Sequence, residues 1–128
     1  AYAKQDFHER HNSLFLGAFE DIEIVGYKSQ FTHSFGDNSR QAFCQVRRGV
    51  GLNPASSLEG YHIHNLFATY LLGPLLLLNP PFTKKLLGLL GVKQPRLAFE
   101  QTATAAYYKR LREYHDPACK GFGEKKEE

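Results

Sequence analysis

The sequence predicts a mixed α/β fold in which a group of antiparallel strands is followed by two helices. Residues 13–35 are rich in β-branched and aromatic residues in short runs, which is typical of hairpins. An Asn-Pro-Pro sequence at 79–81 precedes a leucine-rich segment, and this is a start signal for a helix. Beyond Pro95 apolar residues recur at helical spacing. Because strands and helices do not alternate, the chain alone is expected to form an α+β layer arrangement.

The strand-rich part is expected to contain three strand regions. Residues 13–35 should form hairpins punctuated by Gly17 and Gly26. The loop at 36–39, Gly-Asp-Asn-Ser, consists of residues that accept left-handed backbone or close local turns. A strand at 42–48, a loop at 49–60 and a strand region at 61–72 follow. The continuous apolar run at 66–72 predicts a buried strand at the centre of the sheet, covered on both faces.

Two helices are expected after the strands. Gly73-Pro74 should turn the chain out of the sheet, since proline has no N–H for a sheet ladder. Asn79 is predicted to cap a helix that begins at Pro80 and stops at Gly91. The second helix is predicted from about residue 97 to residue 114, with one stripe facing a core. The residues of this stripe are Leu97, Thr104, Tyr107, Leu111 and Tyr114.

Length and composition fit one ordinary globular domain. The 128 residues are 42% hydrophobic, and the formal charge of +3 comes from scattered basic residues, so a nucleic-acid-binding surface is not expected. The two cysteines stand far apart without a CxxC or Cys/His pattern, which excludes a disulfide scaffold and a zinc finger. The expected compartment is the cytoplasm.

No membrane span is expected. The apolar stretch at 66–92 is divided by Gly73-Pro74, by Asn-Pro-Pro at 79–81 and by Lys84-Lys85 into pieces too short to cross a bilayer. The first twelve residues are polar and do not resemble a secretory signal. Because the chain has no methionine and opens like the tail of a helix, we expect it to be a truncated end of a longer protein. The expected segments are a polar leader at 1–12, a closing helix at 93–116 and a charged tail at 117–128.

The histidines give only weak evidence of a metal site. His62 and His64 flank Ile63 in a predicted strand and would share one face, but no third ligand has suitable spacing. His8 and His11 are expected to be solvated surface residues. We therefore expect no metal and no other cofactor.

The cysteines lack the features of a catalytic nucleophile. Such a cysteine needs a lowered pKa and an exposed position at a strand-to-helix elbow or a helix N-terminus, with a histidine as base. Cys44 lies within the apolar run AFCQV and is expected to be a small core residue, and Cys119 lies near the C-terminal end.

The segment at 59–91 carries a motif that points to a family. The residues that fall in register with this motif are Glu59, Gly60, Asn65, Thr69, Tyr70, Gly73, Pro74, Asn79 and Pro80. They resemble the end of the class I, CobQ-type glutamine amidotransferase domain, where an acidic-Gly pair precedes Asn-x-x-Gly-Thr-Tyr-x-His-Gly-Pro and then Asn-Pro. This family includes cobyric acid synthase and the amidotransferase subunit of lipid II isoglutaminyl synthase. Upstream, IVGYKSQFTHSFG and RRGVGLN are similar to a Val-Gly-Phe strand and a Gly-x-Gly-Asn turn, so the resembling region spans 13–92.

The resemblance implies the C-terminal part of a flavodoxin-like α/β fold. For the whole enzyme it implies glutamine hydrolysis that supplies ammonia to a Mur-ligase-like or synthetase partner. Leu72 occupies the place of the family's catalytic histidine, and leucine can neither accept a proton from a thiol nor stabilise a thiolate. Ala68 replaces a glycine, and Ser29 and Gln30 stand where relatives often carry Asn and His. The family's nucleophilic cysteine belongs to a preceding half that is not among these residues, so we expect the chain alone to be inactive.

Other interpretations of the sequence stay open. One is that His33 or His64 serves as the base in place of the missing family histidine, although the spacing of these residues does not favour this role. The chain is alternatively a non-catalytic binding or assembly module derived from the same fold, which Leu72 favours, or an unrelated α+β enzyme that uses His62 and His64 with a metal. One face of the sheet would be left bare in such a half-fold, so a partner, an oligomer or the helix at 97–114 is expected to cover it.

Overall fold

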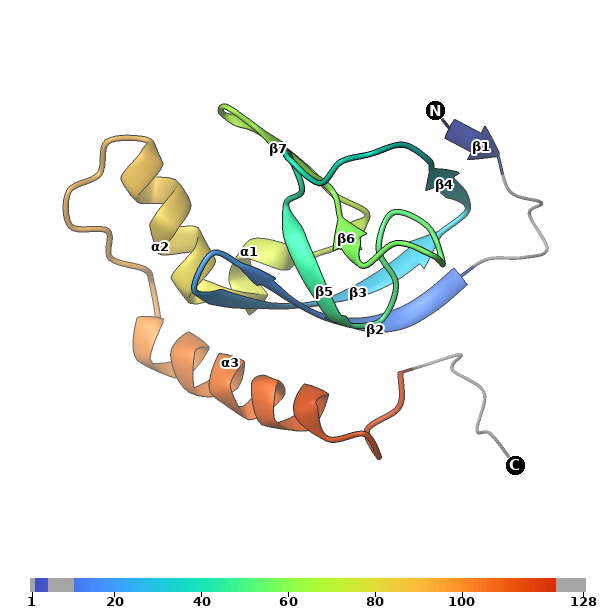
Figure 1. Ribbon diagram of the computed structural model, residues 1–128. Coiled ribbons are helices and arrows are strands. Elements are labelled where there is room, and N and C mark those ends of the chain that lie inside the picture. Colours follow the sequence, from blue (N-terminus) through green and yellow to red (C-terminus); the bar gives the residue numbers. More distant parts are fainter. Residues whose placement is uncertain (1, 5–10, 122–128) are drawn as a thin grey trace.

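A curled antiparallel sheet lies at the centre of the computed structural model, which describes residues 2–4 and 11–121 (Figure 1). Three helices accompany the sheet, so the predicted mixed α/β class is confirmed. Parts of the predicted leader (1 and 5–10) and tail (122–128) lie outside the described residues. The strands are β1 (Tyr2–Lys4), β2 (His11–Phe19), β3 (Ile22–Gln30), β4 (Thr32–Ser34), β5 (Cys44–Arg48), β6 (Leu58–Glu59), β7 (Tyr61–Ile63), β8 (Leu66–Ala68) and β9 (Leu71–Leu72), and the helices are α1 (Leu75–Leu78), α2 (Pro80–Leu89) and α3 (Glu100–His115).

The hairpin of β2 and β3 is the longest ladder of the sheet. It pairs residues from His11 with Gln30 to Phe19 with Ile22, as the strand-like composition of this region predicts. Gly17 lies inside β2, whereas the sequence analysis expected it to separate two short strand runs. A Cβ at Gly17 would lie 2.7 Å from ring atoms of Phe15, so this glycine makes room for a core phenylalanine.

The five-stranded sheet has the order β6-β5-β2-β3-β9, and alternate residues of the hairpin face opposite sides. On one side Phe15 and Ile24 pack with Phe82 of α2 in the larger apolar cluster. On the other side Leu16 and Val25 pack against Tyr107 and Leu111 of α3. Helix α3 therefore packs on the face of the sheet that the sequence analysis expected to be bare in a half-fold.

The prediction that residues 66–72 form one buried central strand is wrong. A turn at His64 and Asn65, with His64 at φ 52°, separates β7 from β8. After a break at Thr69, β9 pairs only with β3 at the edge of the sheet. Leu66 and Leu72 are 57% and 45% exposed, whereas Leu71 is buried. The run itself is divided at Thr69 and Tyr70, where the Thr69 hydroxyl and the Tyr70 N–H donate hydrogen bonds to the carboxylate of Glu59.

The turn at Gly73-Pro74 is present, and the four-residue helix α1, which was not predicted, follows it. Helix α2 begins at Pro80 as expected and ends at Leu89, two residues before the predicted stop at Gly91. Gly91 has φ 92°, its N–H donates to the carbonyl of Gly88, and the N–H of Val92 donates to the carbonyl of Leu87. These two bonds form the Schellman motif that commonly ends a helix.

Helix α3 begins at Glu100 and not at residue 97. The carboxylate of Glu100 accepts a hydrogen bond from the N–H of Leu97 at 3.2 Å, so the residues just before the helix are tied to its first turn. Among the described residues, no helix has the length and apolar content that crossing a membrane requires.

Candidate functional site

A cluster of buried polar residues surrounds the C-terminal half of β3 and the adjoining β4. We call it the buried polar cluster. Each member is less than a tenth exposed, whereas the inward face at the other end of the hairpin is apolar. Its members are Ser13, Lys28, Gln30, His33, Ser34, Asn38, Asn53 and Glu59. Buried polar groups must find partners, so this end of the sheet depends on hydrogen bonding.

The centre of the cluster is an ion pair between Lys28 and Glu59, whose side chains are both completely buried. The ammonium Nζ donates to Glu59 Oε2 at 2.5 Å and to the carbonyls of Gly51 at 2.6 Å and Val50 at 3.0 Å. All three donors of the ammonium are therefore used. Burial lowers the pKa of Lys28, and the charge and hydrogen bond of Glu59 oppose that effect.

The second oxygen of Glu59 ties the ion pair to the residues that follow β8. Oε1 accepts hydrogen bonds from the Thr69 hydroxyl at 2.8 Å and from the backbone N–H of Tyr70 at 2.7 Å. The Thr69 hydroxyl in turn accepts the N–H of Leu71 at 3.0 Å. One carboxylate thus fixes the short connection that leads into β9.

The backbone at position 60 explains why Glu59 is followed by glycine. It has φ 66°, and a Cβ there would lie 2.4 Å from the carbonyl oxygen of Ala68. Its own carbonyl accepts a hydrogen bond from the side chain of Asn38 at 3.0 Å. Only glycine fits this backbone conformation and this close approach together.

The side chain of Asn79 does not cap α2, although the residue stands at the N-cap position. Its amide oxygen accepts the N–H of Val25, and its amide nitrogen donates to the carbonyls of Val25 and Leu75, all at 2.8 Å. Strand β9 leaves β3 at Leu72, so the backbone groups of Val25 would otherwise be unpaired. The side-chain amide of Asn79 replaces a backbone peptide at this edge of β3, and the predicted cap is wrong for that reason.

The structure thus brings part of the family motif together. Glu59, Thr69 and Tyr70 meet directly, and Gly60 adjoins them, while Gly73-Pro74 and Asn79-Pro80 follow β9 in the chain. Asn65 lies at the exposed turn of the β7–β8 hairpin and makes none of these hydrogen bonds. Leu72, at the position of the family histidine, pairs with Tyr27 through the ladder and exposes its side chain.

Lys28 is the principal site residue that the sequence reasoning missed. It stands two residues after Gly26 and four after Ile24, so strand periodicity gives it the same inward direction as a buried isoleucine. This periodicity was the available signal, because a lysine on the core side of a strand requires a buried partner.

A pocket of about 200 Å³ adjoins the cluster. It is lined by Ser34, Leu52, Gly60, Tyr61, Ala68, Thr69 and Tyr70. The hydroxyls of Tyr61 and Ser34 lie 3.2 Å apart, and the hydroxyl of Tyr70 lies 3.0 Å from that of Thr32. In the cluster, Ser13 Oγ, Gln30 Oε1 and His33 Nε2 are buried without a hydrogen-bond partner. Such a site has the volume and the polar groups to hold a small polar molecule.

The two cysteines do not form a nucleophilic centre in the described part of the chain. Cys44 is buried in the apolar cluster, and desolvation together with the charge of Glu59 raises the pKa of its thiol. A raised pKa keeps the sulfur protonated and unreactive. Cys119 follows α3, where its carbonyl accepts a hydrogen bond from the guanidinium of Arg48.

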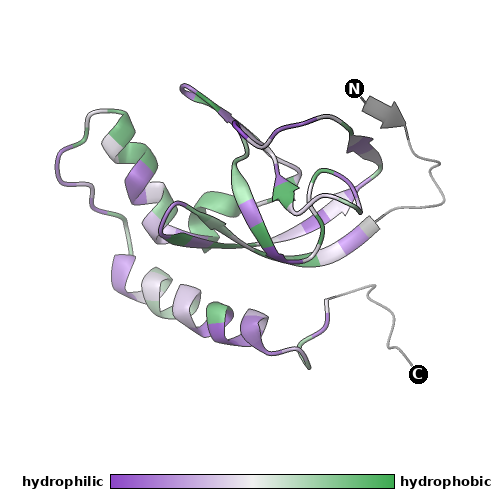
Figure 2. Cartoon of the chain, viewed as in Figure 1, coloured by the Kyte–Doolittle hydropathy of each residue, from purple (hydrophilic) through white to green (hydrophobic). Residues whose placement is uncertain are grey.

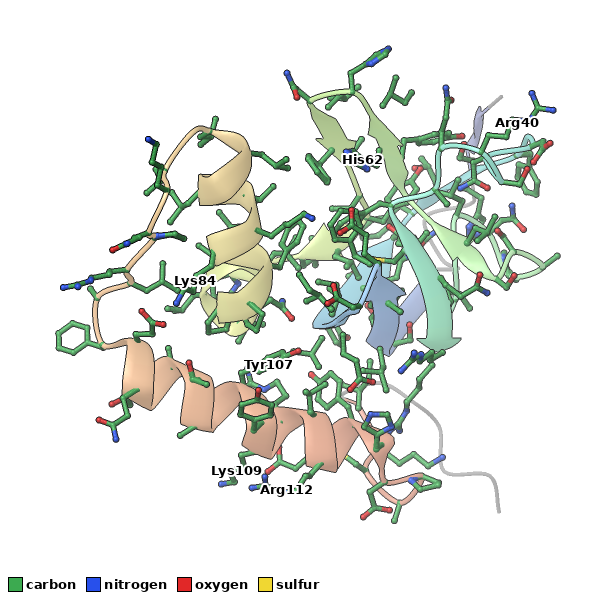
Figure 3. All side chains as sticks on the ribbon, turned by 60° about the vertical axis from the view of Figure 1, so that its left-hand side comes forward. Arg40, His62, Lys84, Tyr107, Lys109 and Arg112 are labelled. Atoms are coloured by element: carbon green, nitrogen blue, oxygen red, sulfur yellow. The ribbon has the colours of Figure 1, made fainter. Side chains whose placement is uncertain are left out.

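His62 and His64 do not share a strand face. The ring of His62, which Figure 3 labels, stacks on the ring of Phe67, with centroids 4.1 Å apart, and makes an edge-to-face contact with the ring of Phe19. His64 lies in the turn and is exposed. Among the described residues no group of three or more His, Cys, Asp or Glu is placed to hold a metal ion. Of the predicted surface pair, His8 lies outside the described residues, and nothing is described of the side chain of His11.

No protein-family model matches the chain, and a sequence search finds no match among curated proteins.

Proposed function

We propose that this chain is the C-terminal portion of a CobQ-like glutamine amidotransferase and supplies the framework of its site, not the reacting groups. The observation that carries the proposal is the bonding of Glu59, whose buried carboxylate accepts hydrogen bonds from two other residues of the family motif, Thr69 and Tyr70. Thr69 and Tyr70 are held on that carboxylate. The strand that follows them ends at Leu72, where the family carries its histidine.

The groups available in this chain support a non-catalytic role for the portion by itself. The side chain of Leu72 has no atom that can accept a proton from a thiol. The Cys44 thiol is buried in the core, and its raised pKa keeps it protonated. In this proposal the nucleophile comes from the other half of the fold, and the position that carries the family's base is occupied by Leu72. The partners that this proposal implies are the nucleophile-bearing half of the fold, glutamine, and a Mur-ligase-like or synthetase protein that accepts ammonia.

Ammonia release from glutamine tests this proposal. The purified chain alone should release no ammonia above the blank. Mixed with the nucleophile-bearing half of a CobQ-like amidotransferase, the Leu72→His variant should restore release, whereas wild type and the matched control Leu72→Ala should not. Turnover by the chain alone that is lost in Cys44→Ala or Cys119→Ala would overturn the non-catalytic role. Failure of Leu72→His to bind the added half would contradict the family assignment.

A second candidate function is that of a non-catalytic binding module derived from the same fold. The pocket of about 200 Å³ favours it, because hydroxyl-bearing side chains of Ser34, Tyr61 and Thr69 are among those that line it. Glutamine titrated into the chain alone should then release heat and raise the melting temperature. The matched pair Tyr61→Phe and Tyr108→Phe separates the pocket from a remote exposed tyrosine, since only the first should weaken that response.

A further inference from the structure

The connection between α2 and α3 carries a surface that the proposed function does not use. We call it the tip surface, and it consists of Leu89, Leu90, Val92, Lys93, Arg96 and Phe99. Leu90 and Phe99 are 80% and 86% exposed, more than the other large apolar side chains of the described residues. In Figure 1 this connection forms the left-hand end of the molecule, and Figure 2 shows apolar and hydrophilic residues following one another along it. Large apolar side chains at a projecting end mark an interaction site.

The charge of this region is one-sided. From Gly60 to Phe99 the sequence contains no aspartate or glutamate, but it contains four lysine or arginine residues. Lys84 and Lys85 are paired with Glu100 and Glu20. Lys93 and Arg96 are exposed and form no salt bridge with any residue that the structure describes. The hydrogen bond from Lys84 is the largest of the causes that lower the pKa of the neighbouring Glu100, and the charge of Arg96 is the smallest. The tip surface therefore combines exposed apolar groups with two cations that have no ion-pair partner in the described residues.

Exposed apolar side chains are also concentrated in the same segment. Of the eleven exposed large apolar residues in the described part of the chain, eight fall between residues 60 and 99: Leu66, Leu72, Leu76, Leu77, Leu89, Leu90, Val92 and Phe99. The turn of the β7–β8 hairpin lies beside the end of α2, where an apolar groove of about 230 Å³ is lined by Asn65, Phe67, Leu86, Leu89 and Leu90. The leucines at the end of α2 thus continue into an apolar recess and are not isolated surface residues.

We propose that the tip surface docks on the headgroup region of an anionic lipid bilayer, with Leu90 and Phe99 inserted and Lys93 and Arg96 on lipid phosphates. Apolar insertion combined with electrostatic attraction is the physical basis of interfacial binding. A second copy of this chain is disfavoured as the occupant, because it would present the same two cations and place like charges against each other. The surface lies on the bilayer and does not span it, which agrees with the length of the described helices.

The absence of tryptophan from the sequence provides a direct readout. Phe99→Trp places a single tryptophan on the tip surface, and Tyr108→Trp places one at an exposed position of α3 as the matched control. Vesicles of phosphatidylcholine mixed equally with phosphatidylglycerol should shift the emission of Phe99→Trp to the blue and leave Tyr108→Trp unchanged. Vesicles of pure phosphatidylcholine should bind at least about tenfold more weakly.

Sedimentation with the same vesicles tests the charges and the apolar anchor separately. Lys93→Gln with Arg96→Gln should weaken partitioning about 25-fold, since each cation near an anionic surface contributes about fivefold. The matched pair Lys109→Gln with Arg112→Gln, on the side of α3 away from the sheet in Figure 3, should change it less than about threefold. Leu90→Ser should weaken partitioning without changing the circular dichroism spectrum, because the leucine is exposed.

Three results would overturn the proposal. The first is absence of binding to the mixed vesicles, and the second is equal binding to the neutral ones. The third is a concentration-dependent dimer in gel filtration that is lost in Leu90→Ser, which would assign the surface to a second copy of the chain.

Discussion

The two ends of the β2–β3 hairpin use the same inward face in different ways. Near the turn, Phe15, Phe19 and Ile24 are stabilised by burial of apolar area in one cluster with Phe82, and the rings of Phe19 and Phe82 make an edge-to-face contact. Toward the other end, Lys28 and Gln30 on the same face are stabilised by hydrogen bonds and an ion pair. The apolar end tolerates changes that keep volume and polarity, whereas the polar end depends on individual atoms.

The largest expected effect comes from placing a charge in the apolar end. Leu71→Asp buries an unpaired carboxylate beside the phenylalanine cluster and should reduce the free energy of unfolding by about 5 kcal/mol. Leu72→Asp is the matched control at the adjacent exposed position and should cost less than about 1 kcal/mol. Urea denaturation followed by circular dichroism measures both. Equal losses in the two variants would mean that Leu71 is not in the core.

Removing one member of the buried ion pair should be almost as severe. Glu59→Ala leaves the Lys28 ammonium buried without its counter-charge and frees Thr69 and the N–H of Tyr70, so a loss of about 4 kcal/mol is expected. Removing both charges together, as Lys28→Met with Glu59→Leu, should restore part of this loss because no isolated charge remains.

The exposed ion pair between Arg47 and Glu23 supplies the control for that experiment. Arg47→Met should cost less than about 1 kcal/mol, since water screens this pair. If the double variant at Lys28 and Glu59 is less stable than Glu59→Ala, the ion pair is not the dominant contribution of these two side chains.

Asn79→Ala removes the side-chain amide that forms hydrogen bonds with the backbone of Val25 at the edge of the sheet. The substitution leaves the N–H and carbonyl of Val25 without partners at the buried edge of β3, so a loss of about 2–3 kcal/mol is expected. The simple loss of a helix cap would cost about 1 kcal/mol. Hydrogen exchange of the Val25 amide distinguishes the two explanations, because only loss of the sheet-like bond should accelerate it strongly.

The comparison of the two ends also explains what the sequence could predict. The β2–β3 hairpin, the strand at 44–48, the stop at Gly91 and most of α3 follow from local residue types and periodicity. The division of residues 61–72 was not predicted, because it depends on a left-handed backbone at His64, which this residue type does not require, and on the hydrogen bonds of Thr69 and Tyr70 to Glu59. Helix α1 has no start signal other than the preceding turn.

Only part of the candidate site could be predicted, because some of its contacts join residues that are far apart in the sequence. Glu59, Thr69 and Tyr70 were selected through the family resemblance, and the structure joins them by direct hydrogen bonds. Their partner Lys28 is far from them in sequence, and only its position on the inward face of β3 could have indicated it. The role of Asn79 depends on the edge of a strand 54 residues earlier, which no local pattern describes.

The smallest expected effect concerns the opposite face of the sheet, where α3 covers the hairpin. The hydroxyl of Tyr107 donates to the carbonyl of Glu23 at 2.7 Å, and burial is the main cause that raises the pKa of Tyr107 to about 12. Tyr107→Phe should cost about 1 kcal/mol at neutral pH by removing that bond, whereas Tyr108→Phe should cost less.

The pH dependence of Tyr107→Phe gives the sharper measurement. A folded-state pKa above the unfolded value of about 10 means that the stabilisation by Tyr107 is complete below pH 10 and is lost as the pH rises toward 12. Wild type should therefore lose more stability between pH 10 and pH 12 than Tyr107→Phe does. Because the bond joins α3 to β3, parallel pH curves for the two proteins would show that the ring alone, and not the hydroxyl, holds the helix on the sheet.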